Sequence, residues 1–169
     1  MLTHNQITSS NTVVLKWLVG LCVFLNLSGI FIPVLGTDGT LYASITKTMV
    51  QNNNYLELFS QNKDWLDKPH LPFWITAVFF KIFGIAGWSY KLPGILIMLM
   101  GAAYTFHFAR RLYDNSTIAL WSVIILLTAE HIIISNHDVR AEGFLTGFII
   151  AAVYHFYRTI QHKTFIHLL

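Results

Sequence analysis

The chain has 169 residues, of which 54% are hydrophobic and only 11% charged, and a formal net charge of +3. Soluble domains carry about 25% charged residues, so this composition excludes a water-facing globular surface and intrinsic disorder, and the single cysteine excludes a disulfide scaffold. Lys and Arg occur singly or in pairs rather than in a dense basic stripe, so we expect a membrane protein with no nucleic-acid partner.

The first long apolar run covers residues 13–35 and is interrupted only by Lys16, Asn26 and small residues. As a helix this run reaches about 34 Å, which is enough for a hydrocarbon core of about 30 Å. A cleaved signal peptide is the alternative, but the run is too long and no small-x-small cleavage site follows before Asp38. We therefore predict an uncleaved membrane anchor.

Two shorter segments follow the anchor, in a predicted external loop of residues 38–91. In the first segment, Asp38 precedes apolar residues at helical spacing, and three consecutive asparagines end the pattern. The second segment, residues 70–84, is strongly apolar, but as a helix it covers only about 22 Å and Lys81 interrupts it. A helix that lies flat in the outer leaflet fits this segment better than a span does.

Three further spans are predicted at residues 92–108, 117–134 and 144–157. The first of them is followed by Arg110 and Arg111, and the last by Arg158 and Lys163. The positive-inside rule places these cations and the N-terminus in the cytoplasm. The predicted fold is an all-α, multi-pass membrane protein, with about four transmembrane helices and two amphipathic juxtamembrane helices in its first external loop.

Acidic and basic residues collect on the predicted external side of the membrane: Asp38, Lys68, Asp138, Arg140 and Glu142. Simpler interpretations exist for each group. Asp38, at the start of a predicted helix, is typical of an N-cap. Lys68, beside an apolar helix, is typical of a cation that reaches the headgroup level. Residues 136–142 are typical of a solvated turn. However, unpaired charge so close to the span that starts at Phe144 is costly, so these groups are expected to pair or to face an aqueous cavity. Glu130, inside the third span, either joins them or pairs with Lys91.

These residue types suit chemistry on a lipid phosphate at the outer face. Arg offers a planar fork and Lys a point charge to a phosphate, and a carboxylate nearby can act as general base toward a hydroxyl. A lipid tail would lie against the aromatic segment 70–84. A metal cluster of His137, Asp138 and Glu142 is the alternative, but its ligands are sparse, so no metal and no cofactor are expected.

Five tracts resemble, in order, motifs of the polyprenyl-phosphate-dependent membrane glycosyltransferases, a superfamily that includes protein mannosyltransferases and lipid A aminoarabinose transferases. Residues 38–43 (DGTLYA) resemble the motif D-E-x-x-Y-A, and residues 68–74 (KPHLPFW) resemble K-P-P-L-x-x-W, with Phe83-Gly84 as the F-G pair that follows it. The three later tracts, which resemble R-L-P, R-R-L-F and R-x-D-x-x-L-T, are residues 91–93 (KLP), 110–113 (RRLY) and 140–146 (RAEGFLT). Three positions depart from the family pattern: Gly39 replaces a second acid, His70 a second proline, and Glu142 an aspartate.

The resemblance implies the N-terminal transmembrane portion of a GT-C type enzyme, because family members continue through further spans. It also implies inverting transfer of a sugar from a polyprenyl-phosphate donor to a hydroxyl of a lipid, glycan or protein acceptor. In that reaction Asp38 is the general base, Lys68 binds the donor phosphate, and Arg140 assists. The supporting residues are Tyr42, Asp138 and Glu142. A lipid phosphate, with a second pKa near ~6, leaves as an anion and needs no general acid.

A second hypothesis differs in class. The same cations also fit a non-catalytic four-span membrane protein that binds lipid phosphate or a membrane partner. Turnover of a lipid-linked sugar distinguishes the two hypotheses.

Overall fold

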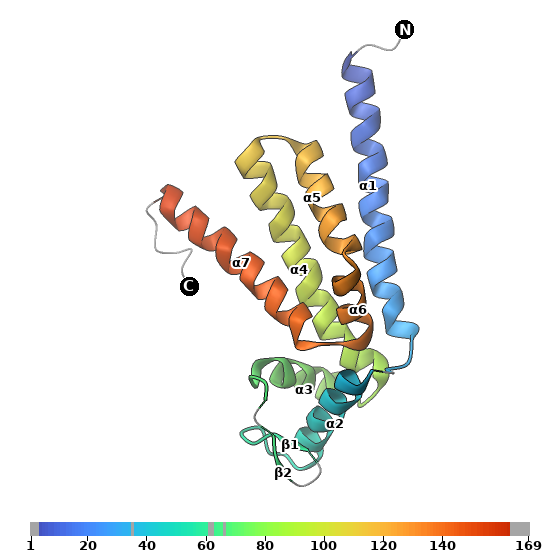
Figure 1. Cartoon of the computed structure of the whole chain (residues 1–169), viewed down its shortest axis with the longest axis vertical. Coiled ribbons are helices and arrows are strands. Elements are labelled where there is room, and N and C mark those ends of the chain that lie inside the picture. Colours follow the sequence, from blue (N-terminus) through green and yellow to red (C-terminus); the bar gives the residue numbers. More distant parts are fainter. Residues whose placement is uncertain (1–3, 35, 61–62, 66, 163–169) are drawn as a thin grey trace.

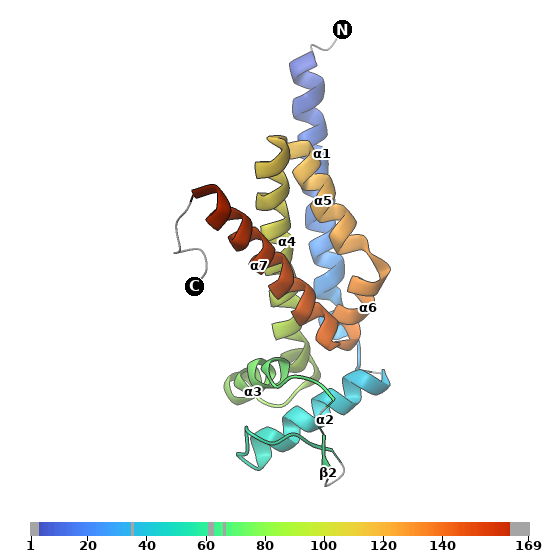
Figure 2. The same cartoon turned by 60° about the vertical axis from the view of Figure 1, so that its left-hand side comes forward.

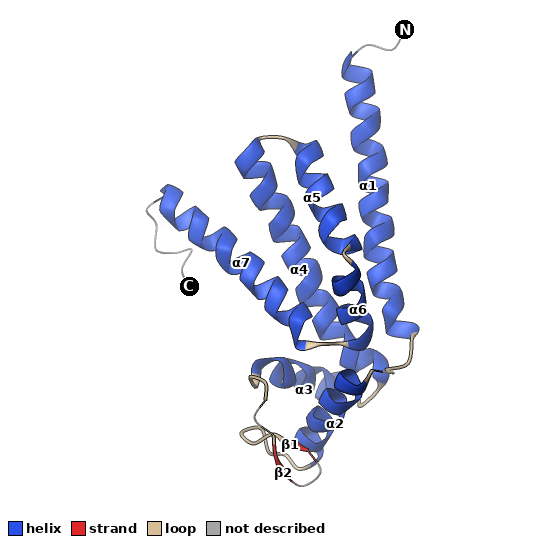
Figure 3. Ribbon diagram, in the orientation of Figure 1, coloured by secondary structure: helices blue, strands red, loops and turns tan. Residues whose placement is uncertain are grey.

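The computed structural model describes residues 4–34, 36–60, 63–65 and 67–162, with the backbone alone described for residues 4–11 and 162. Long helices stand side by side as a bundle, and two shorter helices with a small antiparallel hairpin lie across one end of it (Figures 1, 2 and 3). The elements are α1 (His4–Ser28), η1 (Gly29–Phe31), α2 (Thr37–Gln51), β1 (Phe59–Ser60), β2 (Lys63–Asp64), α3 (Leu71–Phe83), α4 (Gly87–Tyr113), α5 (Ser116–Thr128), α6 (Glu130–Asp138) and α7 (Ala141–His162). The predicted all-α membrane fold is confirmed.

The helix boundaries decide which described segments are long enough to cross a bilayer. Length and hydropathy identify two, Thr12–Phe31 and α4, and a third if α5 and α6 form one broken span with a bend of 55°. The fourth predicted span, residues 144–157, lies within α7, which those criteria do not select. The number of spans therefore stays a prediction. Both juxtamembrane helices are present as α2 and α3, and the hairpin between them was not predicted.

The bend between α5 and α6 interrupts the predicted span 117–134 at Ala129. A buried polar group on α1 satisfies a carbonyl beside the bend. The Asn26 amide, fully buried, donates to Cys22 O at 2.9 Å and to Leu127 O at 3.0 Å, and its oxygen accepts from Asn136 Nδ2 at 2.7 Å. Backbone groups freed within a membrane helix need such partners. Asn26 therefore ties α1 to both halves of the bent segment.

Replacing Asn26 by leucine tests this connection. We expect Asn26→Leu to destabilise the protein by about 1–2 kcal/mol, because Leu127 O and the Asn136 amide each lose a partner in an apolar surrounding. Thermal unfolding in detergent measures the effect, with Gln51→Leu, at an exposed amide on α2, as the control. Equal melting temperatures for the two variants would contradict the assignment.

The buried cation of the bundle is Lys91, in the first turns of α4 rather than in the external loop. Its side chain is fully buried, and its ammonium donates to Gly29 O at 2.9 Å and to Ile32 O at 2.7 Å. Gly29 O also accepts from Ile32 N at 3.2 Å, and a cation beside the last carbonyls of a helix is stabilising. Glu130 is exposed. The predicted pairing of Glu130 with Lys91 is therefore wrong, and Lys91 instead fixes the end of α1 against α4.

The helices α4 and α7 approach each other through glycines. A Cβ built on Gly147 would lie 2.5 Å from Ile97 O, and one built on Gly101 would lie 2.9 Å from the Gly147 Cα atom. Small residues at a membrane helix interface permit this close approach of two backbones. The contact holds the first half of α7 on α4, below the level at which the two helices diverge (Figure 1).

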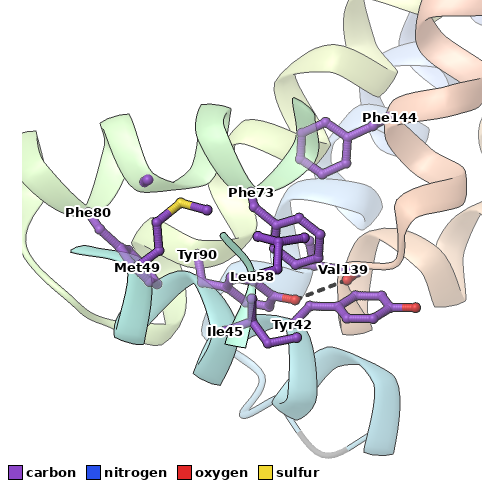
Figure 4. Packing of buried hydrophobic residues seen from close by; sticks show 10 residues of the cluster. Tyr42, Ile45, Met49, Leu58, Phe73, Phe80, Tyr90, Val139 and Phe144 are labelled. Carbon is purple, nitrogen blue, oxygen red and sulfur yellow. Dashed lines mark hydrogen bonds between the residues drawn. The ribbon is translucent and has the colours of Figure 1, made fainter. Parts of the chain in front are cut away.

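A separate apolar core holds α2 and α3 against the end of the bundle (Figure 4). The ring of Tyr42 packs on those of Trp65 and Phe73, with centroids 5.6 and 5.7 Å apart, and the Tyr90 hydroxyl donates to Val139 O at 3.1 Å. The buried members of this core are Tyr42, Ile45, Met49, Leu58, Phe73, Ala77, Phe80, Tyr90, Val139 and Phe144. These contacts fix the juxtamembrane helices to α4 and α7, and so position the side chains described next.

Candidate active site

The sequence-predicted site residues lie at one end of the bundle. Asp38 and Tyr42 are on α2, Lys68 is just ahead of α3, and Asp138, Arg140 and Glu142 surround the connection from α6 to α7. All of these elements meet at the lower end in Figure 1, whereas the end of α4, with its two arginines, lies toward the other end. Lys163, predicted to be cytoplasmic, lies outside the described residues.

Asp38 is exposed and lies in the first turn of α2, one helical turn before Tyr42. The N-cap of α2 is Gly36, so the interpretation of Asp38 as a capping residue is wrong. The helix α3 begins after His70 and has Pro72 in its first turn, so Lys68 and Pro69 precede the helix. The Asp38 carboxylate is free of the capping role and is available to a ligand.

Lys68 and Glu142 line a common cavity of about 350 Å³ between the start of α3 and the start of α7. Its walls are otherwise apolar, formed by Pro69, Leu71, Pro72, Ala141, Phe144, Leu145 and Phe148. One cation and one carboxylate in an apolar cavity of this size suit a charged group that carries an apolar chain. No ion pair or hydrogen bond in the described part of the chain joins Lys68 directly to Asp38.

Arg140 and Tyr42 line a second, much smaller cavity of about 10 Å³, next to the first. The two cavities share Pro72, Ala141 and Phe144. The Arg140 Nε lies 3.6 Å from Asp138 Oδ2, and about a third of the Arg140 side chain remains exposed. Arg140 therefore lies beside an acid, as expected of a charge close to an apolar span, and part of its side chain stays accessible although its Nε is buried.

The metal-cluster alternative receives no support from the geometry. Across residues 4–34, 36–60, 63–65 and 67–162, no group of three His, Cys, Asp or Glu side chains is arranged to hold a metal ion. His137 instead packs on Gly29 and its Nε2 lies 3.3 Å from Leu25 O.

Two features of this end were missed by sequence reasoning. The first feature is Asp67, whose negative charge contributes to the raised pKa of Tyr42. Its position next to Lys68 in the sequence could have identified it as a site residue. The second feature is the contact of Asp138 with Gly36 and Gly39, described below, for which the sequence holds no signal, because the two segments are about a hundred residues apart.

The Tyr42 hydroxyl has a raised pKa. Burial is the main cause, and the negative charges of Asp38, Glu142 and Asp67 add to it, whereas the positive charge of Arg140 opposes it. Tyr42 is thus neutral at physiological pH and can donate a hydrogen bond to a ligand. Tyr42 is therefore close enough to charged residues of α2, of α7 and of the segment before α3 to feel their charge.

This raised pKa gives a pH-dependent stability. The unfolded chain ionises a tyrosine at about pH 10 and the folded chain only at higher pH, so the folded state loses stability as pH rises above about 10. We expect Tyr42→Phe to lose less stability than the wild type between pH 8 and pH 11, as measured by thermal unfolding in detergent. Tyr113→Phe, at an exposed tyrosine on α4, is the control and should follow the wild type.

Comparison with known proteins gives a family and a fold. The family model described as dolichyl-phosphate-mannose-protein mannosyltransferase matches residues 67–169. The chain is 28% identical over 124 residues to an undecaprenyl phosphate-alpha-4-amino-4-deoxy-L-arabinose arabinosyl transferase of Wigglesworthia glossinidia brevipalpis, a match over 73% of this chain and 21% of that protein. A transferase of the same description from Erwinia tasmaniensis is 22% identical over 124 residues, which are 73% of this chain and 22% of that protein.

Solved structures share the arrangement of helices. The crystal structure of ArnT from Cupriavidus metallidurans in the apo state matches with a TM-score of 0.74 at 20% identity, over 86% of this chain and 27% of that chain. The structure of the same protein bound to undecaprenyl phosphate matches with a TM-score of 0.71 at 22% identity, over 85% of this chain and 26% of that chain. The chain thus spans only about a fifth to a quarter of the length of these relatives. The family match covers more than half of the chain, which therefore belongs to the dolichyl-phosphate-mannose-protein mannosyltransferase family of membrane glycosyltransferases.

Proposed function

We propose that this chain contributes the N-terminal part of the active site of an inner-membrane enzyme. The enzyme transfers a sugar from a polyprenyl-phosphate donor to an acceptor hydroxyl, with inversion, on the non-cytoplasmic face. The observation that carries the proposal is the cavity of about 350 Å³ lined by Lys68 and Glu142, at the same end of the bundle as Asp38. The relatives are named for transfer from undecaprenyl phosphate-linked 4-amino-4-deoxy-L-arabinose, which supports the donor class.

The donor phosphate would bind to Lys68, with its chain along the apolar wall of the cavity. Lys68 supplies a point charge and three donors to phosphate oxygens. Arg140, about a third of whose side chain is exposed, would assist, while Glu142 sets the charge on the opposite wall. As the bond between the sugar and the phosphate breaks, the leaving group is stabilised as an anion by these cations.

The acceptor hydroxyl would be deprotonated by Asp38. An exposed carboxylate in the first turn of a helix is accessible to an acceptor hydroxyl and can take its proton. The hydroxyl oxygen then attacks the anomeric carbon from the side opposite the phosphate, which inverts the configuration. The neutral Tyr42 hydroxyl, one turn along α2, supports the site as a hydrogen-bond donor. The proposal requires only that the acceptor carries a hydroxyl group, whether the acceptor is a lipid, a glycan or a protein.

The proposed orientation follows from charge. The site end would face the periplasm, and the opposite end, with Arg110, Arg111 and Arg158 in the last turns of α4 and α7, would face the cytoplasm. Alkylation of single cysteines from either side of intact cells tests this orientation. The variants Asp64→Cys and Tyr113→Cys in a Cys22→Ser background are suitable, because both positions are exposed.

Binding of undecaprenyl phosphate to the purified full-length protein tests the proposal directly. We expect Lys68→Ala to weaken this binding about 10-fold to 100-fold, because a hydrogen bond to a charged group contributes about 1.5–3 kcal/mol. Lys63→Ala, at an exposed lysine on β2, is the matched control and should bind as the wild type does.

Sugar transfer from undecaprenyl phosphate-linked donors, assayed on the same samples, separates the two hypotheses. Binding without any turnover across a panel of lipid-linked sugars would support the non-catalytic lipid-phosphate binder instead. Equal binding by the Lys68 and Lys63 variants would contradict the assigned phosphate site.

A further inference from the structure

The Asp138 side chain contacts the start of α2, about a hundred residues earlier in the chain. Its Oδ1 accepts a hydrogen bond from the Gly36 backbone N–H at 2.8 Å, and only 14% of its side chain is exposed. Gly36 is the N-cap of α2, and its carbonyl accepts from Thr40 N at 3.0 Å, so the hydrogen bond from Asp138 reaches the residue that begins the helix. A bond from a backbone donor to a charged acceptor is among the stronger hydrogen bonds of a protein.

Two glycines make this contact possible. A Cβ built on Gly36 would overlap the Asp138 carboxylate, and one built on Gly39 would overlap the Asp138 carbonyl oxygen and lie 2.6 Å from its Oδ1. These are the closest approaches at either position, so any side chain there would displace Asp138. The carboxylate that the related motif carries at position 39 is thus incompatible with this packing, and an acid from α6 lies against the same turn of α2.

The connection that carries Asp138 is held in one shape. Val139 has a φ of 48°, a left-handed conformation that is rare for a β-branched residue, and it is buried. Its carbonyl accepts from the Tyr90 hydroxyl at 3.1 Å, and the N–H of Arg140 donates to Ser135 O at 3.1 Å. A strained backbone of this kind persists only where its surroundings determine it. It directs Asp138 toward α2 while placing Arg140 beside the cavity that Tyr42 lines.

We propose that Asp138 is a positioning residue, which fixes the start of α2 to the α6–α7 connection and thereby sets the place of Asp38 relative to Arg140. Asp138 does this with both carboxylate oxygens, since Oδ1 accepts from Gly36 and Oδ2 faces the Arg140 guanidinium at 3.6 Å. The absence of a side chain at Gly39 is part of the same arrangement. The consequence for catalysis depends on the proposed function, whereas the positioning itself does not.

Hydrogen–deuterium exchange of the full-length protein in detergent tests the positioning. We expect Asp138→Ala to raise the exchange rate of the amides in residues 36–42 about tenfold, because loss of a hydrogen bond to a charged acceptor costs about 1.5 kcal/mol or more. Asp138→Asn, which keeps an oxygen for Gly36 but loses the charge, should raise it much less. Gly39→Ala, which displaces Asp138 without removing it, should reproduce the effect of Asp138→Ala. Asp64→Ala, at an exposed carboxylate on β2, is the control and should leave exchange unchanged.

The outcomes separate positioning from general destabilisation. Faster exchange confined to residues 36–42 in Asp138→Ala and Gly39→Ala supports the proposal. Unchanged exchange there, or an equal rise in α4 and α7, overturns it.

In the transfer assay, Asp138→Ala should lower kcat with little change in donor KM, and Asp138→Asn should recover part of that loss. If the exchange result holds but kcat is unchanged, the link from Asp138 to Asp38 is overturned. If Asp38→Asn itself remains active, the proposed function fails while the exchange result still decides the positioning.

Discussion

Asp38→Asn is expected to lower the rate of sugar transfer about 100-fold or more, because a positioned general base contributes about that much to proton abstraction. Asparagine keeps the size of the side chain but accepts no proton at neutral pH. Binding of undecaprenyl phosphate should persist, since the proposed phosphate contacts are made by Lys68 and Arg140. The measurement is the initial rate of transfer from undecaprenyl phosphate-linked sugars by the purified full-length protein, with binding determined on the same samples.

Asp64→Asn is the matched control for this variant, because Asp64 is also exposed and lies on the juxtamembrane hairpin, away from the cavity residues. It should transfer sugar at the wild-type rate. Wild-type transfer by Asp38→Asn would remove the assigned base. Loss of both transfer and binding would instead show that Asp38 maintains the structure of the site.

Gly147→Val should have the largest effect on stability, about 3 kcal/mol or more, because its side chain would enter the backbone of α4 at Ile97. The nearest atom is the main-chain oxygen of Ile97, at 2.5 Å, so movement of a side chain alone cannot relieve the overlap. We expect the variant to lose the elution peak of the folded wild type in size-exclusion chromatography in detergent, and its melting temperature to fall steeply.

Gly20→Val provides the comparison, since no atom lies within 4 Å of a Cβ built at Gly20 on α1. Both variants make the same change in a long apolar helix, so helix propensity and added hydrophobicity are matched. Gly20→Val should melt at or slightly above the wild-type temperature. Similar melting of the two variants would contradict the close packing of α4 on α7.

The sequence predicted the helices well where hydrophobic length or spacing decides the structure. The apolar runs 13–35, 92–108 and 144–157 overlap α1, α4 and α7, although α1 begins nine residues and α4 five residues before the predicted run, and the amphipathic spacing after Asp38 gives α2. The prediction from sequence failed where a single polar contact determines the local structure. The break at Ala129 lies inside the predicted span 117–134, directly before Glu130, and hydropathy contains no information about the Asn26 amide that satisfies Leu127 O. In the same way, the burial of Lys91 depends on the carbonyls of Gly29 and Ile32, which only the folded chain brings near it.

The candidate site was predictable as a set of residue types on one side of the membrane. Charge placement near apolar spans pointed to Lys68, Arg140 and Glu142, and the resemblance added roles for them. The partners of these residues were not predictable. Asp138 was grouped with the site by proximity in the sequence, but its contact with Gly36 exists because the folded chain brings the last residue of α6 to the residue before α2, which no local pattern records. The glycine at position 39 was also not explicable from the sequence, because a side chain there would overlap Asp138, which comes from a distant segment.

The hydrogen bond from Gly36 to Asp138 spans 102 positions of the chain, and this separation has a consequence for biogenesis. During synthesis, α2 is made early, and its start lacks the hydrogen bond to Asp138 until the ribosome has also made α3, α4, α5 and α6. Pairings between such distant segments form late, because the intervening chain must first be ordered. Nascent chains arrested before residue 138 should therefore expose the start of α2 to protease, and those extended past α7 should protect it.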